Sequence, residues 1–377
     1  MAHQLIDDDR DLTVQAGVAR MFEQFGRIGH QDFVILAYTP ECRIYAAHAG
    51  VFLDSLGVGW ASVPMAPLLD AGIGERLTAK LPSPAGFVGN LVVATLERDT
   101  MSHFEVFTPL FDRYGIARTK ILRVISASDD FFRYALAYGP EQLERLNATL
   151  LAEFSGRSRI RVTAPGGTDL DITLDQNKYD WISNRGRLRP GAFTILPPGE
   201  IATFPARVDG VLVADGAVNC NVVTELDMRL AKAPITFQIE DSSIRAFDCP
   251  GTAMNEFLQR AFTLPHARKV GELGFGTNQA IPSFVAHNSH MNERRSGLHI
   301  GFGQHNQPLS VVGYDARIHI DVITDDATIH FDNGRTVTLS RLIPAPGVEH
   351  PQLIRDEDIT GDCCSSGCAR VSIDTRR

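Results

Sequence analysis

The chain has 377 residues, of which 44% are hydrophobic and 21% charged, and its formal net charge is -9 at pH 7. These values are typical of a globular protein that is long enough to bury two hydrophobic cores. The acidic balance argues against nucleic acid or an anionic membrane as a partner, and no apolar run reaches the roughly 18 residues of a membrane span.

The N-terminal segment, MAHQLIDDDRD, is acidic and lacks the apolar stretch of a signal peptide. Cys42, Cys220 and Cys249 are scattered through the body of the chain, which fits reduced thiols. We therefore expect a cytoplasmic protein.

The first part of the chain alternates between helix and strand patterns. Apolar residues recur on one helical face of residues 14–27, and short apolar runs of buried-strand type follow. A strand, a helix and a second strand in succession form a βαβ unit, which implies a parallel sheet. The pattern predicts strands at 33–37, 59–64, 89–95 and 119–125, and helices at 41–55, 102–114 and 129–154, the last with a break at Gly139-Pro140.

Residues 1–155 are therefore expected to form an α/β domain with a parallel sheet. This region contains no GxGxxG and no Walker motif. Without a loop to cradle phosphates, the sequence assigns no nucleotide to it.

The pattern changes after Gly156 to short alternating runs punctuated by Gly and Pro, which predict an α+β domain rich in antiparallel strands over 156–377. The predicted strands are 158–163, 169–174, 210–214 and 235–239, and the predicted helix is 252–264. A flexible tail is expected from about residue 355. Its three cysteines match no zinc motif, which leaves open a soft-metal or redox role or an incidental cluster. They are Cys363, Cys364 and Cys368.

The second domain is expected to carry a metal site. Eight of the twelve histidines lie between His266 and His350, which favours a metal or acid–base site. Within the glycine-rich window 271–321, carboxylates and imidazoles are separated by short turns, a pattern that suits divalent metal ions. The side chains of His319 and Asp321, two residues apart on a predicted strand, point to the same face. The window contains Glu272, Glu293, His299, His319 and Asp321.

A further carboxylate, Glu200, follows Pro197-Pro198-Gly199. The prolines stiffen the chain and the glycine permits a tight turn, so the segment could mount a metal ligand. The alternative is an ordinary exposed loop glutamate.

Four other residues of the window have weaker assignments. His290, like His287, is expected to be a solvated loop residue. Arg294 and Arg295 are expected either to hold a substrate carboxylate by a bidentate contact or to form a surface pair.

As a set, these motifs resemble the M29 family of metallopeptidases, the aminopeptidase T and aminopeptidase S type. The resemblance covers most of residues 156–321 and extends to the α/β half only in general layout. It rests on Ala164–Asp169, the Pro-x-Gly-Glu-x-x-Thr-x-Pro pattern around Glu200, Gly271–Asn278, Glu293–Gly303 and His319–Asp321.

The resemblance implies an aminopeptidase with two metal ions, zinc, cobalt or manganese, that activate a water. It implies that Glu293 is a general base or an outer carboxylate. The family has a tyrosine seven residues after the histidine that matches His299, but this chain has Asn306 there, with His305 before it. His305 or Tyr314 is then the candidate to replace the tyrosine hydroxyl. The metal ligands that the resemblance implies are Glu200, Glu272, His299, His319 and Asp321.

Two alternatives remain open. A ring-cleaving Fe(II) dioxygenase that opens dihydroxypyridine is similar to the same family and uses two histidines and one carboxylate. It has a histidine at the position of Glu272 and lacks a match for His299, so the hydrolase is favoured. A non-hydrolytic relative that acts on a peptide or natural product is the other alternative. The expected partners are a peptide or small-molecule substrate and, from the family habit, a second copy in a homodimer.

Overall fold

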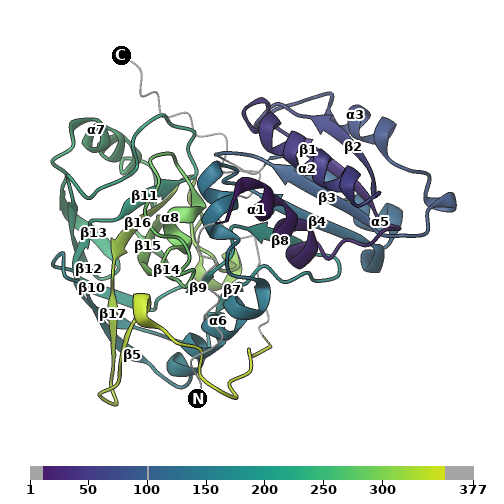
Figure 1. Ribbon diagram of the computed structural model, residues 1–377. Helices are drawn as coiled ribbons and strands as arrows, with labels where there is room; N and C mark the ends of the chain where they lie inside the picture. The colour runs from purple at the N-terminus through teal and green to yellow at the C-terminus, as the bar shows by residue number, and fades with distance from the viewer. Residues whose placement is uncertain (1–11, 100–101, 353–377) are drawn as a thin grey trace. The chain divides into compact units, whose positions relative to one another are not determined.

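The computed structural model describes residues 12–99 and 102–352, which form two compact units (Figure 1). The first unit comprises the described residues up to Arg98 together with His103–Pro140 and Gly186–Pro198. The second unit comprises Glu141–Arg185 and the described residues from Gly199 onward, together with Asp99 and Ser102.

The first unit is built on a five-stranded sheet in the order β2-β1-β3-β4-β8, in which every neighbouring pair is parallel. Apolar runs without alternation form the central strands at Phe33–Tyr38 and Leu91–Leu96, because helices cover both faces of such a sheet. The strands are β1 (Phe33–Tyr38), β2 (Gly59–Pro64), β3 (Leu91–Leu96), β4 (Thr119–Val124) and β8 (Phe193–Leu196).

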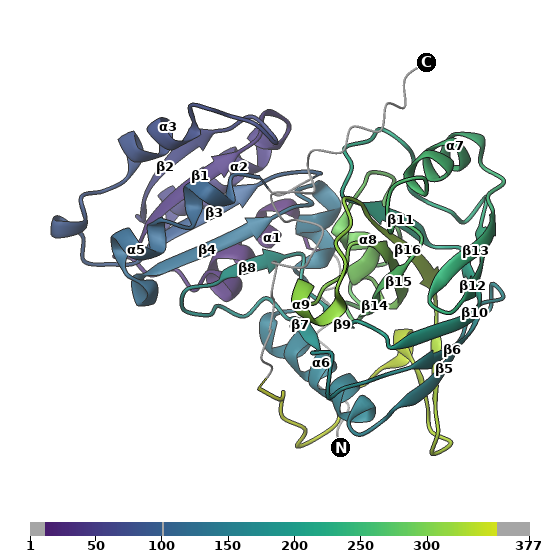
Figure 2. The ribbon, with the colours of Figure 1, turned by 180° about the vertical axis from the view of Figure 1, so that it is seen from behind.

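Helices α3 to α5 pack on one face of this sheet, where Ile35, Val93 and Ile121 join Leu77 and Phe111 in a buried cluster. Figure 2 shows α3 and α5 on that side. The helices of the unit are α1 (Val14–Arg20), continued by a π-helical turn at Met21–Phe25, then α2 (Arg43–Ser55), α3 (Ile73–Lys80), α4 (Phe104–Phe107), α5 (Leu110–Tyr114) and a second π-helical turn at Phe131–Ala135.

The second unit contains two antiparallel sheets. The seven-stranded sheet has the order β13-β12-β10-β6-β5-β17-β18. Its strands are β5 (Arg159–Thr163), β6 (Asp169–Thr173), β10 (Arg207–Ala214), β12 (Ile235–Glu240), β13 (Ser243–Asp248), β17 (Thr328–Phe331) and β18 (Thr336–Thr338).

The six-stranded sheet has the order β11-β16-β15-β14-β9-β7. Its strands are β7 (Ile182–Asn184), β9 (Glu200–Thr203), β11 (Ala217–Cys220), β14 (Val270–Gly276), β15 (Gly297–Gly303) and β16 (His319–Asp325). The helices of the unit are α6 (Pro140–Phe154), α7 (Thr252–Ala261), α8 (His290–Arg294) and α9 (Leu309–Val312).

Aromatic side chains fill the core between these elements. Phe302 of β15 lies 5.4 Å, between ring centroids, from Phe237 of β12. Phe275 of β14 lies 5.2 Å from Phe154 of α6, whose ring is also 4.7 Å from Trp181. The six-stranded sheet thus buries an apolar face, and its other face is available for polar side chains.

A parallel sheet in the first unit and antiparallel sheets in the second confirm the mixed α/β organisation expected from the sequence. The two units divide the chain less simply than a single cut after residue 155. Helix α6 belongs to the second unit because Phe154 packs into its core, and β8 belongs to the first because Phe193 pairs in parallel with Ile121.

One predicted helix differs from the structure, and the predicted tail lies outside the described residues. The helix expected over 102–114 is two short helices, α4 and α5, with Pro109 as the N-cap of the second. The tail with Cys363, Cys364 and Cys368 lies outside the described residues. Along the described ranges, no helix has both the length and the apolar character needed to cross a bilayer.

Candidate metal centre

Neighbouring strands of the six-stranded sheet bring together all five predicted metal ligands. Each of the five side chains is at least 90% buried. In Figure 1 strands β14, β15 and β16 run side by side with α8 next to them. The ligands are Glu200 on β9, Glu272 on β14, His299 on β15, and His319 and Asp321 on β16.

The alternation of each strand explains why the ligands share one face. In β14, Leu273 and Phe275 are fully buried in the apolar core. Glu272 and Gly274 therefore point to the opposite face, because successive side chains of a strand alternate. On β16 the same alternation buries Ile320 between His319 and Asp321.

Glycines opposite the ligands leave room for them. Gly274 pairs with His299, and a Cβ at Gly274 would lie 1.9 Å from His299 Nε2. A Cβ at Gly301 would lie 2.8 Å from His319 Cε1 and 2.9 Å from Asp321 Oδ1. The glycines of β14 and β15 thus leave the space that the side chains of the site occupy.

The donor atoms lie close enough to surround a common ion. His299 Nε2 is 2.8 Å from Glu200 Oε1 and 3.7 Å from Glu272 Oε1. His319 Nε2 is 3.8 Å from Glu272 Oε2 and 3.0 Å from Asp321 Oδ1. Ligands that bind one ion at about 2.1 Å are separated from each other by about 3 to 3.5 Å, so small movements would complete such a shell.

A hydrogen bond to the backbone fixes the orientation of the His319 ring. Its Nδ1 lies 2.8 Å from the carbonyl oxygen of Gln304, which accepts a hydrogen bond from it. Nε2 is therefore the nitrogen that faces the carboxylates, an arrangement common to metal-binding histidines. Burial by itself would raise the pKa of Asp321, but the charges of His319 and His299 and the hydrogen bond with His319 outweigh it and lower that pKa below its ordinary value.

Three buried polar atoms test whether these residues fit a metal. His299 Nδ1 and Asp321 Oδ2 have no hydrogen-bond partner, although buried polar groups are nearly always satisfied. His299 Nε2 lies 2.8 Å from Glu200 Oε1, but without the geometry of a hydrogen bond. Two groups of three residues could each hold a cation, and both include His299: one with Glu200 and Glu272, the other with Glu293 and Asp321. Carboxylate and imidazole donors with unsatisfied atoms fit a divalent metal ion.

Glu293 enters the site from α8, which begins after Ser289, whose hydroxyl accepts a hydrogen bond from the Met291 amide. Glu293 is 4% exposed. Its Oε2 accepts a hydrogen bond of 2.9 Å from Asn219 Nδ2, and its Oε1 lies 3.0 Å from Arg294 Nη1. The carboxylate is therefore held in one orientation beside the predicted metal ligands.

Asn219 is a site residue that the sequence analysis missed. It lies on β11 directly opposite Asp321 in the strand register. The alternation in Ala217–Cys220 could have indicated a short strand with one polar side chain, but nothing in it indicates pairing with β16.

Arg294 and His290 also differ from expectation. Arg294 is 2% exposed and forms an ion pair with Glu200, so it belongs to the acidic cluster and is not part of a surface pair. His290 is buried, with Nε2 3.6 Å from Glu293 Oε1, so the prediction of a solvated loop histidine is wrong. Arg295 pairs instead with Asp325.

Helix α6 positions Glu200 through its backbone. Asn147 is fully buried, and its Nδ2 donates hydrogen bonds to the carbonyl oxygens of Glu200, at 2.8 Å, and Asn184, at 3.2 Å. Its Oδ1 accepts a hydrogen bond from the hydroxyl of Thr277. One amide thus ties β7, β9 and the end of β14 together next to the site.

His305 has both ring nitrogens in contact with the backbone. Nε2 lies 2.6 Å from the carbonyl oxygen of Tyr314, and Nδ1 accepts a hydrogen bond of 3.3 Å from the Gln307 amide. The Tyr314 hydroxyl donates to the carbonyl oxygen of Gly303 at 3.2 Å. These contacts give both side chains a role in holding the turn after β15.

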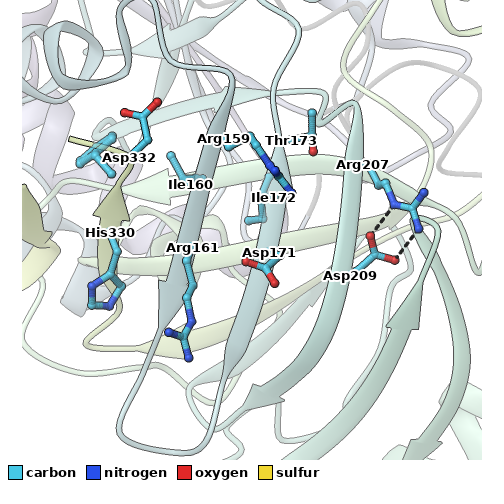
Figure 3. A pocket seen from close by; sticks show the side chains of 11 residues that line it. Arg159, Ile160, Arg161, Asp171, Ile172, Thr173, Arg207, Asp209, His330 and Asp332 are labelled. Atoms are coloured by element: carbon cyan, nitrogen blue, oxygen red, sulfur yellow. Dashed lines mark hydrogen bonds and ion pairs between the residues drawn. The ribbon is translucent and has the colours of Figure 1, made fainter. Parts of the chain in front are cut away.

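A separate depression lies on the seven-stranded sheet, lined by side chains of β5, β6, β10 and β17 (Figure 3). Its charged groups are largely paired with each other or with neighbours. Arg207 binds Asp209, and Arg161 binds Asp169 through two hydrogen bonds of 2.6 Å. The depression thus offers surface ion pairs, in contrast to the buried, unsatisfied donors of the metal centre.

Comparison with known proteins gives one partial family match and a shared fold with solved structures. A family model described as "Crocagin biosynthetic protein CgnE/B" matches residues 203–332, about a third of the chain. No curated protein matches.

Two solved structures are similar. One is a 2,5-dihydroxypyridine dioxygenase from Pseudomonas putida KT2440, at 15% identity and a TM-score of 0.55, covering 88% of this chain and 97% of that one. The other is wild-type AmpT from Thermus thermophilus, at 13% identity and a TM-score of 0.51, covering 86% of this chain and 97% of that one. The fold is thus shared with both, and a metal-dependent enzyme is consistent with the buried donor groups.

Proposed function

We propose that this chain is a metal-dependent hydrolase that cleaves an amide bond at the N-terminus of a peptide or a related small molecule. The observation that carries the proposal is the set of buried donors on one sheet face, with unsatisfied atoms on His299 and Asp321. In this proposal Glu272, His299, His319 and Asp321 hold the metal, and Glu200 lies beside them. Zinc, cobalt and manganese all suit such mixed nitrogen and oxygen ligands.

A divalent ion bound there supplies a water of lowered pKa and polarises the substrate carbonyl. Glu293 accepts the proton of the attacking water and delivers it to the leaving nitrogen as the C–O bond forms and the C–N bond breaks. Asn219 and Arg294 hold the two oxygens of Glu293 for this transfer. The backbone contacts of both ring nitrogens of His305 favour Glu293 over His305 as the proton carrier.

The test is a peptide panel assayed with protein purified without chelator or nickel resin. We expect release of N-terminal amino acids, with none from N-acetylated versions of the same peptides. Glu293→Gln should lower turnover by about 100-fold or more, because general acid–base catalysis contributes that much. Its metal content should equal that of the wild type. Bound metal without release from any free peptide would contradict the proposal.

A second candidate is oxidative. Two imidazoles and Asp321 form a set that also suits a single Fe(II) ion, and the dioxygenase of Pseudomonas putida shares the fold. One iron per chain with oxygen consumption on a dihydroxylated aromatic ring would support it.

A third candidate is a biosynthetic role without hydrolysis. It is supported by the family match. The matched range includes four of the five predicted ligands and begins after Glu200. Bound metal, no peptide turnover and binding of a modified peptide would favour it. For the same protein we propose a cytoplasmic location, in keeping with Cys42, Cys220 and Cys249 not forming disulfides, and a homodimer.

A further inference from the structure

Arg294 places a fixed positive charge inside the acidic cluster. Its side chain is 2% exposed. Nη1 forms an ion pair with Glu200 Oε2 and lies 3.0 Å from Glu293 Oε1. The guanidinium therefore bridges two carboxylates that belong to different groups of possible metal ligands.

These contacts remove donors that a second ion would need. Oε1 of Glu293 faces Arg294 and Oε2 accepts a hydrogen bond from Asn219, so both oxygens of this carboxylate are engaged. Oε2 of Glu200 also faces Arg294, so only its Oε1, which lies 2.8 Å from His299 Nε2, remains available as a donor. A guanidinium cannot be deprotonated in a protein, and a metal ion placed at the same oxygens would be repelled by it.

The remaining donors form one connected set. Glu272 lies between the two histidines, with Oε1 3.7 Å from His299 Nε2 and Oε2 3.8 Å from His319 Nε2. Asp321 Oδ1 lies 3.0 Å from His319 Nε2, and Asp321 Oδ2 is unsatisfied. Two imidazoles and two carboxylates are a complete set for a single divalent ion.

We infer that this chain binds one divalent metal ion, held by Glu272, His299, His319 and Asp321, and that the Arg294 guanidinium takes the place of a second ion. The inference rests on the proposed metal-dependent function and departs from the two ions that the family resemblance implies. It makes one of three positive charges, beside the two of the ion, a permanent part of the protein.

The experiment counts bound ions and measures how close they are. Metal-free protein is titrated with Mn(II), excess ion is removed by gel filtration, and the manganese per chain is measured by elemental analysis. Electron paramagnetic resonance then distinguishes an isolated Mn(II) ion from a spin-coupled pair. We expect one equivalent with the spectrum of an isolated ion.

Arg294→Ala should bind a second equivalent and show spin coupling, because it frees Glu200 and Glu293. Arg295→Ala is the matched control, since this neighbouring arginine pairs with Asp325 and stacks over Phe284 instead. It should bind one equivalent, like the wild type. Arg294→Lys keeps the charge and should also bind one.

Glu200→Gln provides a second variant should Arg294→Ala fail to fold. Glu200 is an outer contact in this arrangement, so its change should weaken Mn(II) binding by about 10- to 100-fold and leave the count at one. Two coupled ions in the wild type would overturn the inference but leave the proposed hydrolase intact. No bound ion in the wild type would overturn both.

Discussion

Glu272 of β14 and Asp321 of β16 lie in one row of the six-stranded sheet, each directly opposite Gly301 of β15. The two carboxylates can share an ion only because the residue between them has no side chain. A Cβ at Gly301 would lie 2.8 Å from the Cβ of Glu272 and 2.9 Å from Asp321 Oδ1.

Gly301→Ala should therefore weaken metal binding by about 10- to 100-fold or more, the cost of displacing groups around a ligand set. The measurement is a metal titration by calorimetry. Gly251→Ala is the control, because a Cβ there meets its nearest atom only at 3.8 Å. Equal affinities of the two variants would contradict the role given to Gly301.

His305→Phe should lower stability without changing metal content. The substitution leaves the partly buried carbonyl of Tyr314 and the buried amide of Gln307 without these partners, at a cost of up to about 1 to 3 kcal/mol for each unsatisfied group. Urea unfolding followed by Trp181 fluorescence in a Trp60→Phe background measures the cost, and elemental analysis measures the metal. Loss of metal at unchanged stability would instead place His305 in the site.

The buried ion pair of Arg123 and Glu97 should contribute strongly to the stability of the first unit. Their contact is 3.0 Å, the side chains are 0% and 1% exposed, and the guanidinium lies over the rings of Phe104 and Phe107. Glu97→Leu leaves a buried charge and should cost about 3 to 5 kcal/mol. Unfolding monitored by Trp60 in a Trp181→Phe background tests this. Asp169→Asn, in an exposed ion pair, should leave the urea midpoint nearly unchanged.

The stability contributed by Asp32 should depend on pH. Burial raises the pKa of Asp32, but hydrogen bonds from the Asn90 and Gly29 amides and the charge of Lys120 outweigh it, so the folded-state pKa is below the ordinary 3.8. A lowered pKa stabilises the fold above the unfolded pKa, and this contribution is lost as the pH falls through the folded value.

Asp32→Asn should thus cost about 1 to 3 kcal/mol at pH 7, the range for charge-assisted hydrogen bonds, and progressively less below about pH 4. Urea unfolding of both proteins at a series of pH values measures the difference. A difference that stays constant down to pH 3 would show that the charge of Asp32 is not what stabilises the fold.

The sequence indicated the residues that the six-stranded sheet brings together, because their chemistry and spacing are local properties. The single-residue gap between His319 and Asp321 fixes a shared face on any strand. The sequence could not indicate Arg294, because its burial depends on α8 lying against β14 to β16. The same holds for Asn219, which faces Asp321 only through the pairing of β11 with β16. Likewise, the membership of α6 in the second unit depends on the distant partners of Asn147 and Phe154.

The alternation in β14 also has a consequence for folding fidelity. A slip of one residue in its pairing would turn Glu272 into the apolar core and Leu273 into the polar face. The misaligned strand would have to bury a carboxylate without a partner, which is strongly unfavourable. Metal binding requires the correct pairing of β14, β15 and β16 at once, so a bound ion reports that this part of the chain has reached its native alignment.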